Sequence, residues 1–163
     1  MSDAELRTLL DRAAISDVVH GYATGLDTRD WALYRSIFLD EIEMDFASIG
    51  IPSGVFQADQ WVESAKTLFK GLDATQHVSS NHVHDIRGDE ATCVSYMKAE
   101  HFVADDALDE ATNQDRWTIG GTYTNELVRT PDGWKLKKVT LRVTWSRGNR
   151  NLAAIALKRG RAR

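Results

Sequence analysis

The sequence predicts an α+β fold in which three helices, all in the N-terminal half, cover a curved and mostly antiparallel sheet. Two observations carry this prediction. Residues up to about 70 show mainly helical periodicity, whereas from residue 77 onward the pattern is that of long strands joined by tight turns. Helices followed by a run of such strands are typical of α+β proteins, with the helices on one face of the sheet.

The helical part divides into three segments. Ser2 or Asp3 can cap a first helix that runs to about Leu26, Asp30 can cap a short second helix, and a third spans residues 57–70. Apolar residues recur at three- and four-residue spacing in the first helix, and this stripe predicts its buried face. The stripe consists of Leu6, Leu9, Leu10, Ala13, Ile15, Val18, Val19, Tyr22 and Leu26.

The strands follow from alternation and from turn chemistry. A short strand is expected at 42–46, followed by a loop at 50–54. Four long strands are expected at about 77–86, 91–103, 116–129 and 133–146. Turns at 87–90 and 130–133 join two pairs of them, and the acidic segment 105–115 is expected to be a loop.

Composition indicates one globular domain over residues 1–163, with a core at about 5–148 and a C-terminal tail at 149–163. The net charge of −4 argues against nucleic-acid binding. Cys93 is the single cysteine, so no internal disulfide can form, and it is expected to be a small buried residue. Without a signal-peptide pattern or a membrane-length apolar run, we expect a soluble, cytoplasmic protein. The basic end of the tail, 158–163, is expected to be solvated and frayed.

One face of the predicted sheet is apolar with a few polar insertions, which is the composition of a ligand pocket as much as of a core. Residues two apart on a strand share a face, and this parity selects the candidate pocket walls. These candidate substrate-binding residues are Phe46, Met97, Ile119, Tyr123, Val139, Leu141, Val143 and Trp145.

Asp27 and His77 are the candidate acid–base pair. A carboxylate and an imidazole held together in an apolar pocket make a proton-transfer device. From the pattern alone, Asp27 lies on the flank of the first helix's stripe, where it could equally be exposed or cap the next helix. Likewise, His77 alone fits an ordinary structural histidine at the start of a strand.

Four segments together resemble a known family. They are residues 14–17 with 26–31, residues 75–77, residues 119–126 and residues 132–136. In order and spacing they resemble the SnoaL-like α+β cone proteins of the nuclear-transport-factor-2-like superfamily. The resemblance covers about residues 5–148. It is strongest to the branch of scytalone dehydratase, hexachlorocyclohexane dehydrochlorinase and bile-acid 7α-dehydratase.

The resemblance implies a cone-shaped sheet around a hydrophobic pocket, with Asp27 and His77 as a catalytic dyad at its mouth. It also makes Tyr22 and His101 candidate catalytic residues, with Tyr22 as a proton donor. The chain departs from two relatives. Scytalone dehydratase's two water-holding tyrosines are replaced by Leu26 and Phe46, and the dehydrochlorinase's arginine aligns with Val139. After these departures, the resemblance still implies a proton-transfer reaction in general, without assigning either relative's substrate.

The resemblance therefore implies a cofactor-independent lyase or isomerase, foremost a dehydratase acting on a hydrophobic cyclic carbonyl compound. Two alternatives stay open. One is a non-catalytic ligand-binding module, or an accessory subunit like that of ring-hydroxylating dioxygenases. The other is a polyketide cyclase or steroid isomerase that uses the same site for a different product. No cofactor is expected.

No metal site is expected either. His82 and His84 form a His-x-His pair on one strand face, but no suitably spaced third and fourth ligand is evident, so solvated histidines are the expectation. The expected partners are a small hydrophobic molecule and further copies of the chain, but neither nucleic acid nor membrane. A homodimer or homotrimer would form through the open sheet face, where Lys138, Arg142 and Thr144 would lie beside Trp134 and Leu136.

Overall fold

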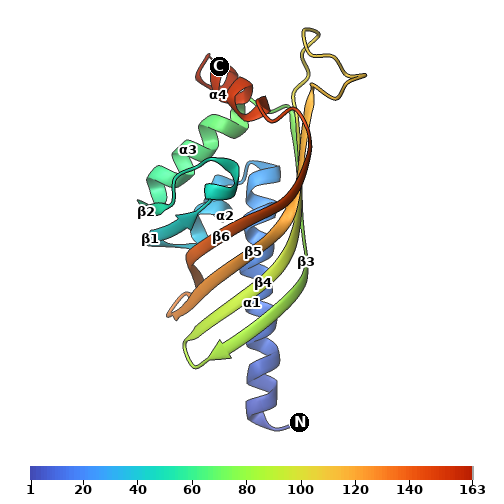
Figure 1. Ribbon diagram of the computed structural model, residues 1–163. Helices are drawn as coiled ribbons and strands as arrows, with labels where there is room; N and C mark the ends of the chain where they lie inside the picture. Colours follow the sequence, from blue (N-terminus) through green and yellow to red (C-terminus); the bar gives the residue numbers. More distant parts are fainter. Residues whose placement is uncertain (163) are drawn as a thin grey trace.

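The computed structural model describes residues 1–162 as an α+β domain, as predicted (Figure 1). The helices are α1 (Asp3–Thr28), α2 (Trp31–Ser36), the short 3-10 helix η1 (Ala47–Ile49), α3 (Ala58–Lys70) and α4 (Leu152–Ala162). The strands are β1 (Phe38–Asp45), β2 (Gly54–Gln57), β3 (Ala74–Arg87), β4 (Glu90–Phe102), β5 (Arg116–Thr130) and β6 (Gly133–Gly148).

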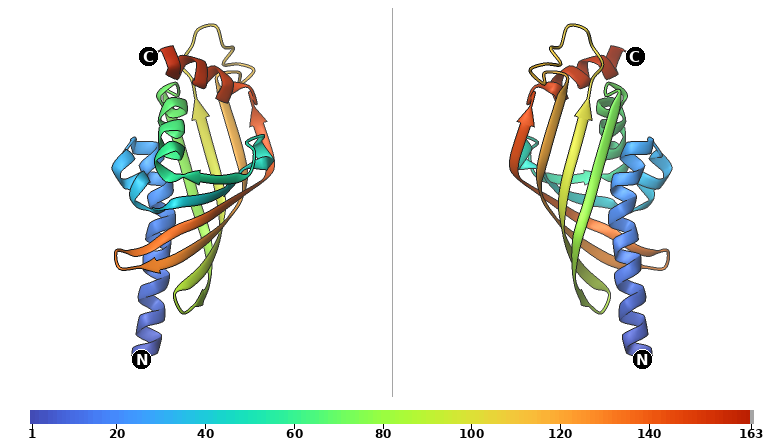
Figure 2. Two further views of the ribbon diagram at one scale, coloured as in Figure 1. Left: turned by 90° about the vertical axis from the view of Figure 1, so that its left-hand side faces the viewer. Right: turned by 90° about the vertical axis from the view of Figure 1, so that its right-hand side faces the viewer.

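The six strands form one curved sheet in the order β2-β1-β6-β5-β4-β3 (Figures 1 and 2). Only the β1–β6 pair is parallel, so the sheet is mostly antiparallel, as expected. Apolar residues of α1, α2, α3 and the inner face of the sheet form a single core. This arrangement leaves a pocket between the helices and the sheet.

Helix α1 is well capped and firmly anchored, but its first turns extend beyond the sheet (Figure 1). Ser2 and Glu5 form a capping box at its start. Asp11 pins the helix to the sheet by accepting two hydrogen bonds of 2.7 Å from Arg129 and one of 3.1 Å from Trp134. Burial of the apolar stripe begins only at Ile15. The expectation that Leu6, Leu9, Leu10 and Ala13 are buried is therefore wrong, because all four are exposed.

Two irregularities in β6 change which side chains face the core. The pairing with β5 shifts register between Glu126 and Leu127 and again between Gly120 and Gly121. Each extra residue in β6 reverses the alternation of its faces. The face predictions made for its two ends are therefore wrong.

Trp134 and Leu136 point inward and are 4% and 1% exposed, so they cannot take part in the oligomer interface expected of them. Trp145 points outward and is 49% exposed, so it is not a pocket wall. Its indole packs against Gly120, where an added Cβ would lie only 2.2 Å from the ring.

The C-terminal segment is a helix, so the expectation of a frayed tail at 158–163 is wrong over its described part, up to residue 162. Leu152, Ala156 and Gly160 recur every four residues and form the buried stripe of α4. Gly71 and Gly160 allow α3 and α4 to touch, because a Cβ on either would lie within 2 Å of a backbone carbonyl oxygen of the other helix. Ala153 and Leu157 of α4 line the pocket between the helices and the sheet, so α4 covers part of it.

The structure also tests the predictions for Cys93 and for the loops. Cys93 is fully buried and free, as expected. The acidic segment 105–115 is a loop between β4 and β5, whereas strand β2 went unpredicted beside the expected loop at 50–54. Within residues 1–162, no helix has both the length and the apolar character that crossing a bilayer would require.

Candidate active site

A cavity of about 540 Å³ lies between the helices and the inner face of the sheet. Five of the predicted wall residues line it: Phe46, Met97, Ile119, Tyr123 and Leu141. Tyr22, His77 and His101 also reach its surface, so the structure brings three of the four predicted catalytic side chains to one cavity. The substrate-binding role of these residues stays a prediction.

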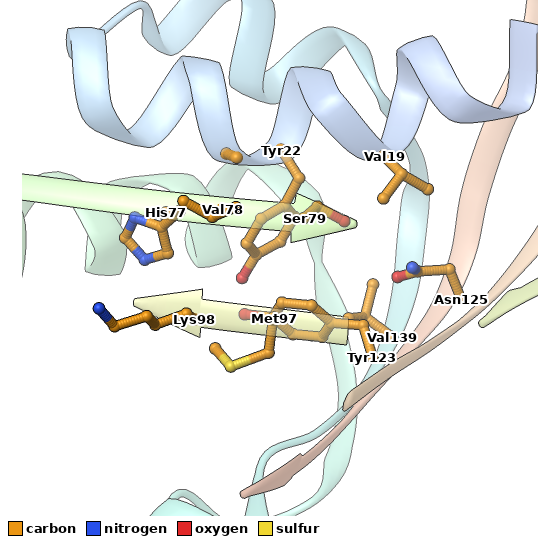
Figure 3. A pocket seen from close by; sticks show the side chains of 11 residues that line it. Val19, Tyr22, His77, Val78, Ser79, Met97, Lys98, Tyr123, Asn125 and Val139 are labelled. Carbon is orange, nitrogen blue, oxygen red and sulfur yellow. The ribbon is translucent and has the colours of Figure 1, made fainter. Parts of the chain in front are cut away.

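The remaining predicted wall residues lie elsewhere. Val139 lines a much smaller space of about 10 Å³ between α1 and the sheet, beside Tyr22, Tyr123 and Asn125 (Figure 3). Such a space can hold about one water molecule. Val143 packs against the core without lining either cavity, and Trp145 lies on the outer face of the sheet.

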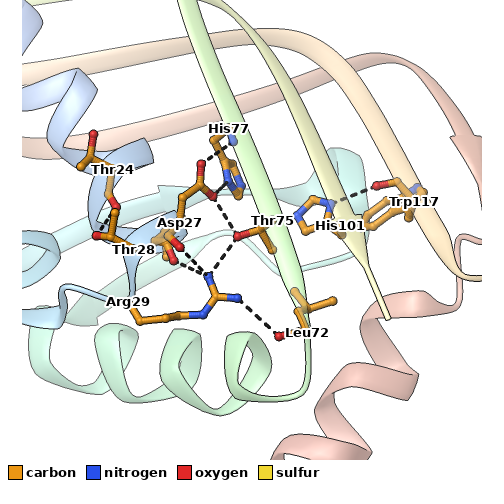
Figure 4. A network of polar contacts seen from close by, with 10 residues as sticks. Thr24, Asp27, Thr28, Arg29, Leu72, Thr75, His77, His101 and Trp117 are labelled. Atoms are coloured by element: carbon orange, nitrogen blue, oxygen red, sulfur yellow. Dashed lines mark hydrogen bonds and ion pairs between the residues drawn. The ribbon is translucent and has the colours of Figure 1, made fainter. Parts of the chain in front are cut away.

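Asp27 and His77 touch, although 50 residues separate them in the chain. Asp27 lies in the last turn of α1 and His77 near the start of β3. The distance from Asp27 Oδ1 to His77 Nδ1 is 2.7 Å, and the backbone N–H of His77 donates to Asp27 Oδ2 at 2.6 Å (Figure 4). The carboxylate thus holds both the ring and the main chain of the histidine.

This geometry fixes the protonation pattern of the pair. A carboxylate can only accept, so Nδ1 of His77 carries the hydrogen and Nε2 keeps its lone pair. His77 lines the large cavity, whereas Asp27 lies behind it. Burial alone would raise the pKa of the Asp27 carboxyl, but hydrogen bonds from His77 and Thr75 and the nearby imidazole outweigh it and lower that pKa. Asp27 is therefore ionised near neutral pH and stabilises an imidazolium on its partner.

Thr75 and Arg29 support the dyad from behind, and the sequence predictions assigned neither of them a role. Thr75 donates from Oγ1 to Asp27 Oδ1 at 2.8 Å, and Arg29 Nη1 donates to Thr75 Oγ1 at 3.0 Å (Figure 4). Arg29 also lies over the ring of Phe69, 5.1 Å from its centroid. Thr75 could have been found from its parity with His77, whereas nothing in the pattern marks Arg29.

His101 lies beside the dyad, but its environment keeps it neutral. Its ring meets that of His77 edge-on at 5.4 Å between centroids, and its Nδ1 donates to the Trp117 carbonyl at 3.1 Å (Figure 4). Burial, followed by the nearby His77, lowers the pKa of His101 to about 4. Near neutral pH its Nε2 is therefore a hydrogen-bond acceptor, not a reservoir of acid.

Three tyrosine side chains, Tyr22, Tyr34 and Tyr123, cluster at the wall of the cavity. The ring centroids of Tyr34 and Tyr123 lie 5.2 and 5.6 Å from that of Tyr22, and Trp61 Nε1 donates to the Tyr34 hydroxyl at 3.0 Å. Figure 3 shows Tyr22 reaching from α1 toward the sheet. Burial raises the pKa of all three hydroxyls, so each stays protonated. A protonated tyrosine hydroxyl carries one hydrogen, so this group can donate a hydrogen bond to a ligand oxygen.

Comparison with known proteins places the chain in a family. The model of the SnoaL-like domain matches residues 7–140. This chain belongs to the SnoaL-like domain family. No curated protein matches it significantly.

Solved structures share the fold of this SnoaL-like protein. The Kfla4162 protein from Kribbella flavida is 31% identical with a TM-score of 0.80, over 90% of this chain and 99% of that one. A candidate scytalone dehydratase from Novosphingobium aromaticivorans is 19% identical, with a TM-score of 0.72 over 87% and 93% of the two chains. A hexachlorocyclohexane dehydrochlorinase, LinA type 3, from Novosphingobium barchaimii is 22% identical, with a TM-score of 0.69 over 87% and 92%. At identities of 19% and 22%, the last two structures show only that this chain has the same fold.

Proposed function

We propose that this SnoaL-like protein is a cofactor-independent lyase of the dehydratase type. The observation that carries the proposal is the contact of 2.7 Å between Asp27 and His77, with the histidine facing the cavity and the carboxylate behind it. In this order the carboxylate orients the imidazole and stabilises its protonated form. Positioned proton transfer of this kind typically accelerates a reaction by about 10²–10⁴-fold.

The proposed reaction starts from a carbonyl compound that bears a hydroxyl group on the β-carbon. Nε2 of His77 takes the proton from the α-carbon, and the electron pair of the C–H bond forms the enolate. A hydroxyl hydrogen of the tyrosine group Tyr22–Tyr34–Tyr123 stabilises the enolate oxygen. The α–β double bond then forms as the C–O bond breaks, and the imidazolium protonates the departing hydroxyl to give water.

Tyr22 suits the role of hydrogen-bond donor better than that of acid. Burial raises the pKa of its hydroxyl well above the usual value, so full proton transfer from it is disfavoured, while hydrogen bonding to an oxyanion is not. His101 is neutral and can accept a hydrogen bond from a substrate hydroxyl. The imidazolium of His77 is therefore the proposed acid of the second step.

The proposed substrate class is a hydrophobic cyclic or polycyclic carbonyl compound. The cavity of about 540 Å³ falls within the usual range for drug-sized ligands, and its walls include Phe46, Trp61, Phe69 and Trp117. Such walls favour flat, apolar rings. Two fold neighbours are described as acting on scytalone and on hexachlorocyclohexane, which supports a ring substrate without identifying it.

The alternatives predict different outcomes at the same site. An isomerase or cyclase would return the proton to another atom, so its product would keep the oxygen. A binding module would need no dyad; an Asp27 side chain turned to solvent would have favoured it, and the contact with His77 instead supports catalysis.

The proposal is tested by turnover of a panel of cyclic β-hydroxyketones, followed by ultraviolet absorption of the enone product. We expect His77→Gln to abolish turnover and Asp27→Asn to reduce it by about 10²–10⁴-fold. Asp132→Asn, the same change in an exposed turn, is the matched control and should be neutral. Equal turnover by the wild type and His77→Gln would contradict the proposal.

A further inference from the structure

A second cluster of reactive side chains lies under α1, away from the large cavity. His82 and His84 come from β3 and Cys93 from β4, and none of the three lines that cavity. One ligand atom from each can be chosen so that all three lie within 4.8 Å of one another. The expectation that these histidines are solvated is wrong, because both are partly buried and hydrogen-bonded to α1.

The backbone brings the three side chains to one face of the sheet. His84 and Cys93 are direct partners in the antiparallel β3–β4 pair, so their side chains lie side by side. A bulge between Ser80 and Val83 places two residues of β3 opposite one of β4, with Asn81 at a φ of +56°. The left-handed residue costs energy, and it lies where the bulge turns His82 and His84 to the face that His77 and Ser79 occupy before it.

The polar contacts of the cluster leave one nitrogen without a partner. The Ser16 hydroxyl lies 2.9 Å from His84 Nε2 and 3.0 Å from His82 Nδ1, and Ser79 Oγ lies 2.9 Å from His82 Nε2. His84 Nδ1 is buried without a hydrogen-bond partner within residues 1–162. On the other side of Cys93, its cross-strand partner Asn125 also buries an unpartnered Nδ2.

We propose that His82, His84 and Cys93 bind a borderline-soft transition metal ion such as Zn²⁺. Two imidazoles and a thiolate are the donor set that such ions prefer. A bound ion would explain the buried nitrogen, which a hydrogen-bonded histidine cluster leaves unexplained. This site is independent of the proposed catalytic function.

The neighbouring groups suit the outer shell of such a site. A histidine that binds a metal usually holds its other ring nitrogen by a hydrogen bond, which sets its orientation. For His84 that partner is the Ser16 hydroxyl at Nε2, with the unpartnered Nδ1 free to bind the ion. For His82, Ser79 holds Nε2 and itself donates to Ser95 at 3.1 Å, and Nδ1 would exchange its hydrogen bond with the Ser16 hydroxyl for the ion.

Metal binding would require only small changes in this cluster. Bond lengths of about 2.0–2.3 Å separate the ligands of a tetrahedral ion by roughly 3.5 Å, so separations of up to 4.8 Å need only modest side-chain rotations. Water or the Ser16 hydroxyl can take the fourth position. Burial raises the pKa of the Cys93 thiol to about 11, so metal binding must displace its proton.

The test uses Co²⁺ as a spectroscopic substitute for Zn²⁺. We expect the metal-free protein to bind one equivalent of Co²⁺, with visible bands of tetrahedral cobalt and a near-ultraviolet thiolate-to-cobalt charge-transfer band. Addition of Zn²⁺ should remove both. The near-isosteric variant Cys93→Ser should lose the charge-transfer band, and His84→Gln should weaken binding by at least about tenfold. Circular dichroism would establish that both variants are folded.

His101→Gln is the matched control, because it removes a histidine of the large cavity and leaves the cluster intact. It should give the wild-type cobalt spectrum. Two outcomes would overturn the proposal: a wild-type protein that shows no charge-transfer band with Co²⁺, or a band that persists in Cys93→Ser. Failure here would leave the dehydratase proposal untouched, since that proposal is tested by turnover in the absence of added metal.

Discussion

Asp27 accepts hydrogen bonds from three groups: the ring and the backbone N–H of His77, and the hydroxyl of Thr75. Each favours the ionised carboxylate, which is why its pKa is lowered despite burial. Thr75 is therefore a positioning residue that acts through Asp27. Its removal should weaken the dyad without abolishing it.

We predict that Thr75→Val lowers kcat/KM about tenfold and moves the acidic limb of its pH profile to higher pH. The physical reason is that the Asp27 carboxylate loses one donor, so its pKa rises. The measurement is kcat/KM against pH for the wild type, Thr75→Val and Thr75→Ser. The serine variant keeps the hydroxyl and should restore the wild-type limb; an unchanged limb in the valine variant would count against this role.

His101 should make folding stability depend on pH. Its pKa is about 4 in the folded chain, against an ordinary 6.5, so the unfolded chain binds its proton first as the pH falls. The stability that this residue contributes is complete above pH 6.5 and is lost progressively toward pH 4, by up to about 3 kcal/mol.

Urea denaturation of the wild type and His101→Gln at several pH values between 4.5 and 7 measures this contribution. The pH dependence should be shallower in the variant. Because burial also lowers the pKa values of His82 and His84, part of the dependence will remain. Parallel curves for the two proteins would contradict the buried, neutral state of His101.

The sequence predicted the positions of side chains correctly where the strand alternation is regular. Parity placed Met97, Ile119 and Tyr123 correctly on the cavity, because β4 and β5 keep a continuous register there. It failed for Trp145, because a bulge is a single extra residue that leaves no mark in the alternation. Periodicity left Asp27 on a helix flank; only the resemblance joined it to His77.

Helix α4 was missed because its buried stripe is made of small residues. Alanine and glycine contribute little to an apolar pattern, and the basic end of the segment suggested solvent exposure. The packing explains the choice of residues, since Gly71 and Gly160 let two backbones touch. Small residues thus hold the cover of the cavity in place.

We predict that Gly71→Ala destabilises the protein by about 1–3 kcal/mol and loosens α4. The new methyl group would lie 1.8 Å from the carbonyl oxygen of Ala156, and backbone cannot yield cheaply. Gly54→Ala is the matched control, because its methyl would make only ordinary contacts of 3.6 Å with Phe56. Thermal unfolding of both variants measures the difference; equal melting temperatures would contradict the close packing of α3 and α4.

At the level of the assembled molecule, the outer face of the sheet carries large exposed apolar side chains. They are Val78, Val83, Val94, Tyr96 and Trp145, with exposed fractions between 37% and 67%. We propose that a second copy of the chain covers this face, giving the expected homodimer or homotrimer. The interface residues proposed here therefore differ from the expected Trp134 and Leu136, which are buried.

Size-exclusion chromatography with light scattering should show two or three copies at micromolar concentration. The double variant Val94→Lys with Tyr96→Glu should shift the mass toward the monomer of 18.3 kDa, because burying charges on this face is costly. Substitution of the exposed Leu9 of α1 by lysine is the control for a change elsewhere on the surface. A monomeric wild type would contradict the assembly.

The central claim, that His77 removes an α-proton with the help of Asp27, is tested most directly by solvent exchange. The measurement is deuterium incorporation at the α-carbon of a cyclic ketone without a β-hydroxyl, such as 1-tetralone, followed by proton NMR in D₂O. We expect the wild type and Asp132→Asn to exchange at the same rate, His77→Gln to fall to the uncatalysed rate, and Asp27→Asn to fall by about 10²-fold or more. Exchange by His77→Gln at the wild-type rate would contradict the account.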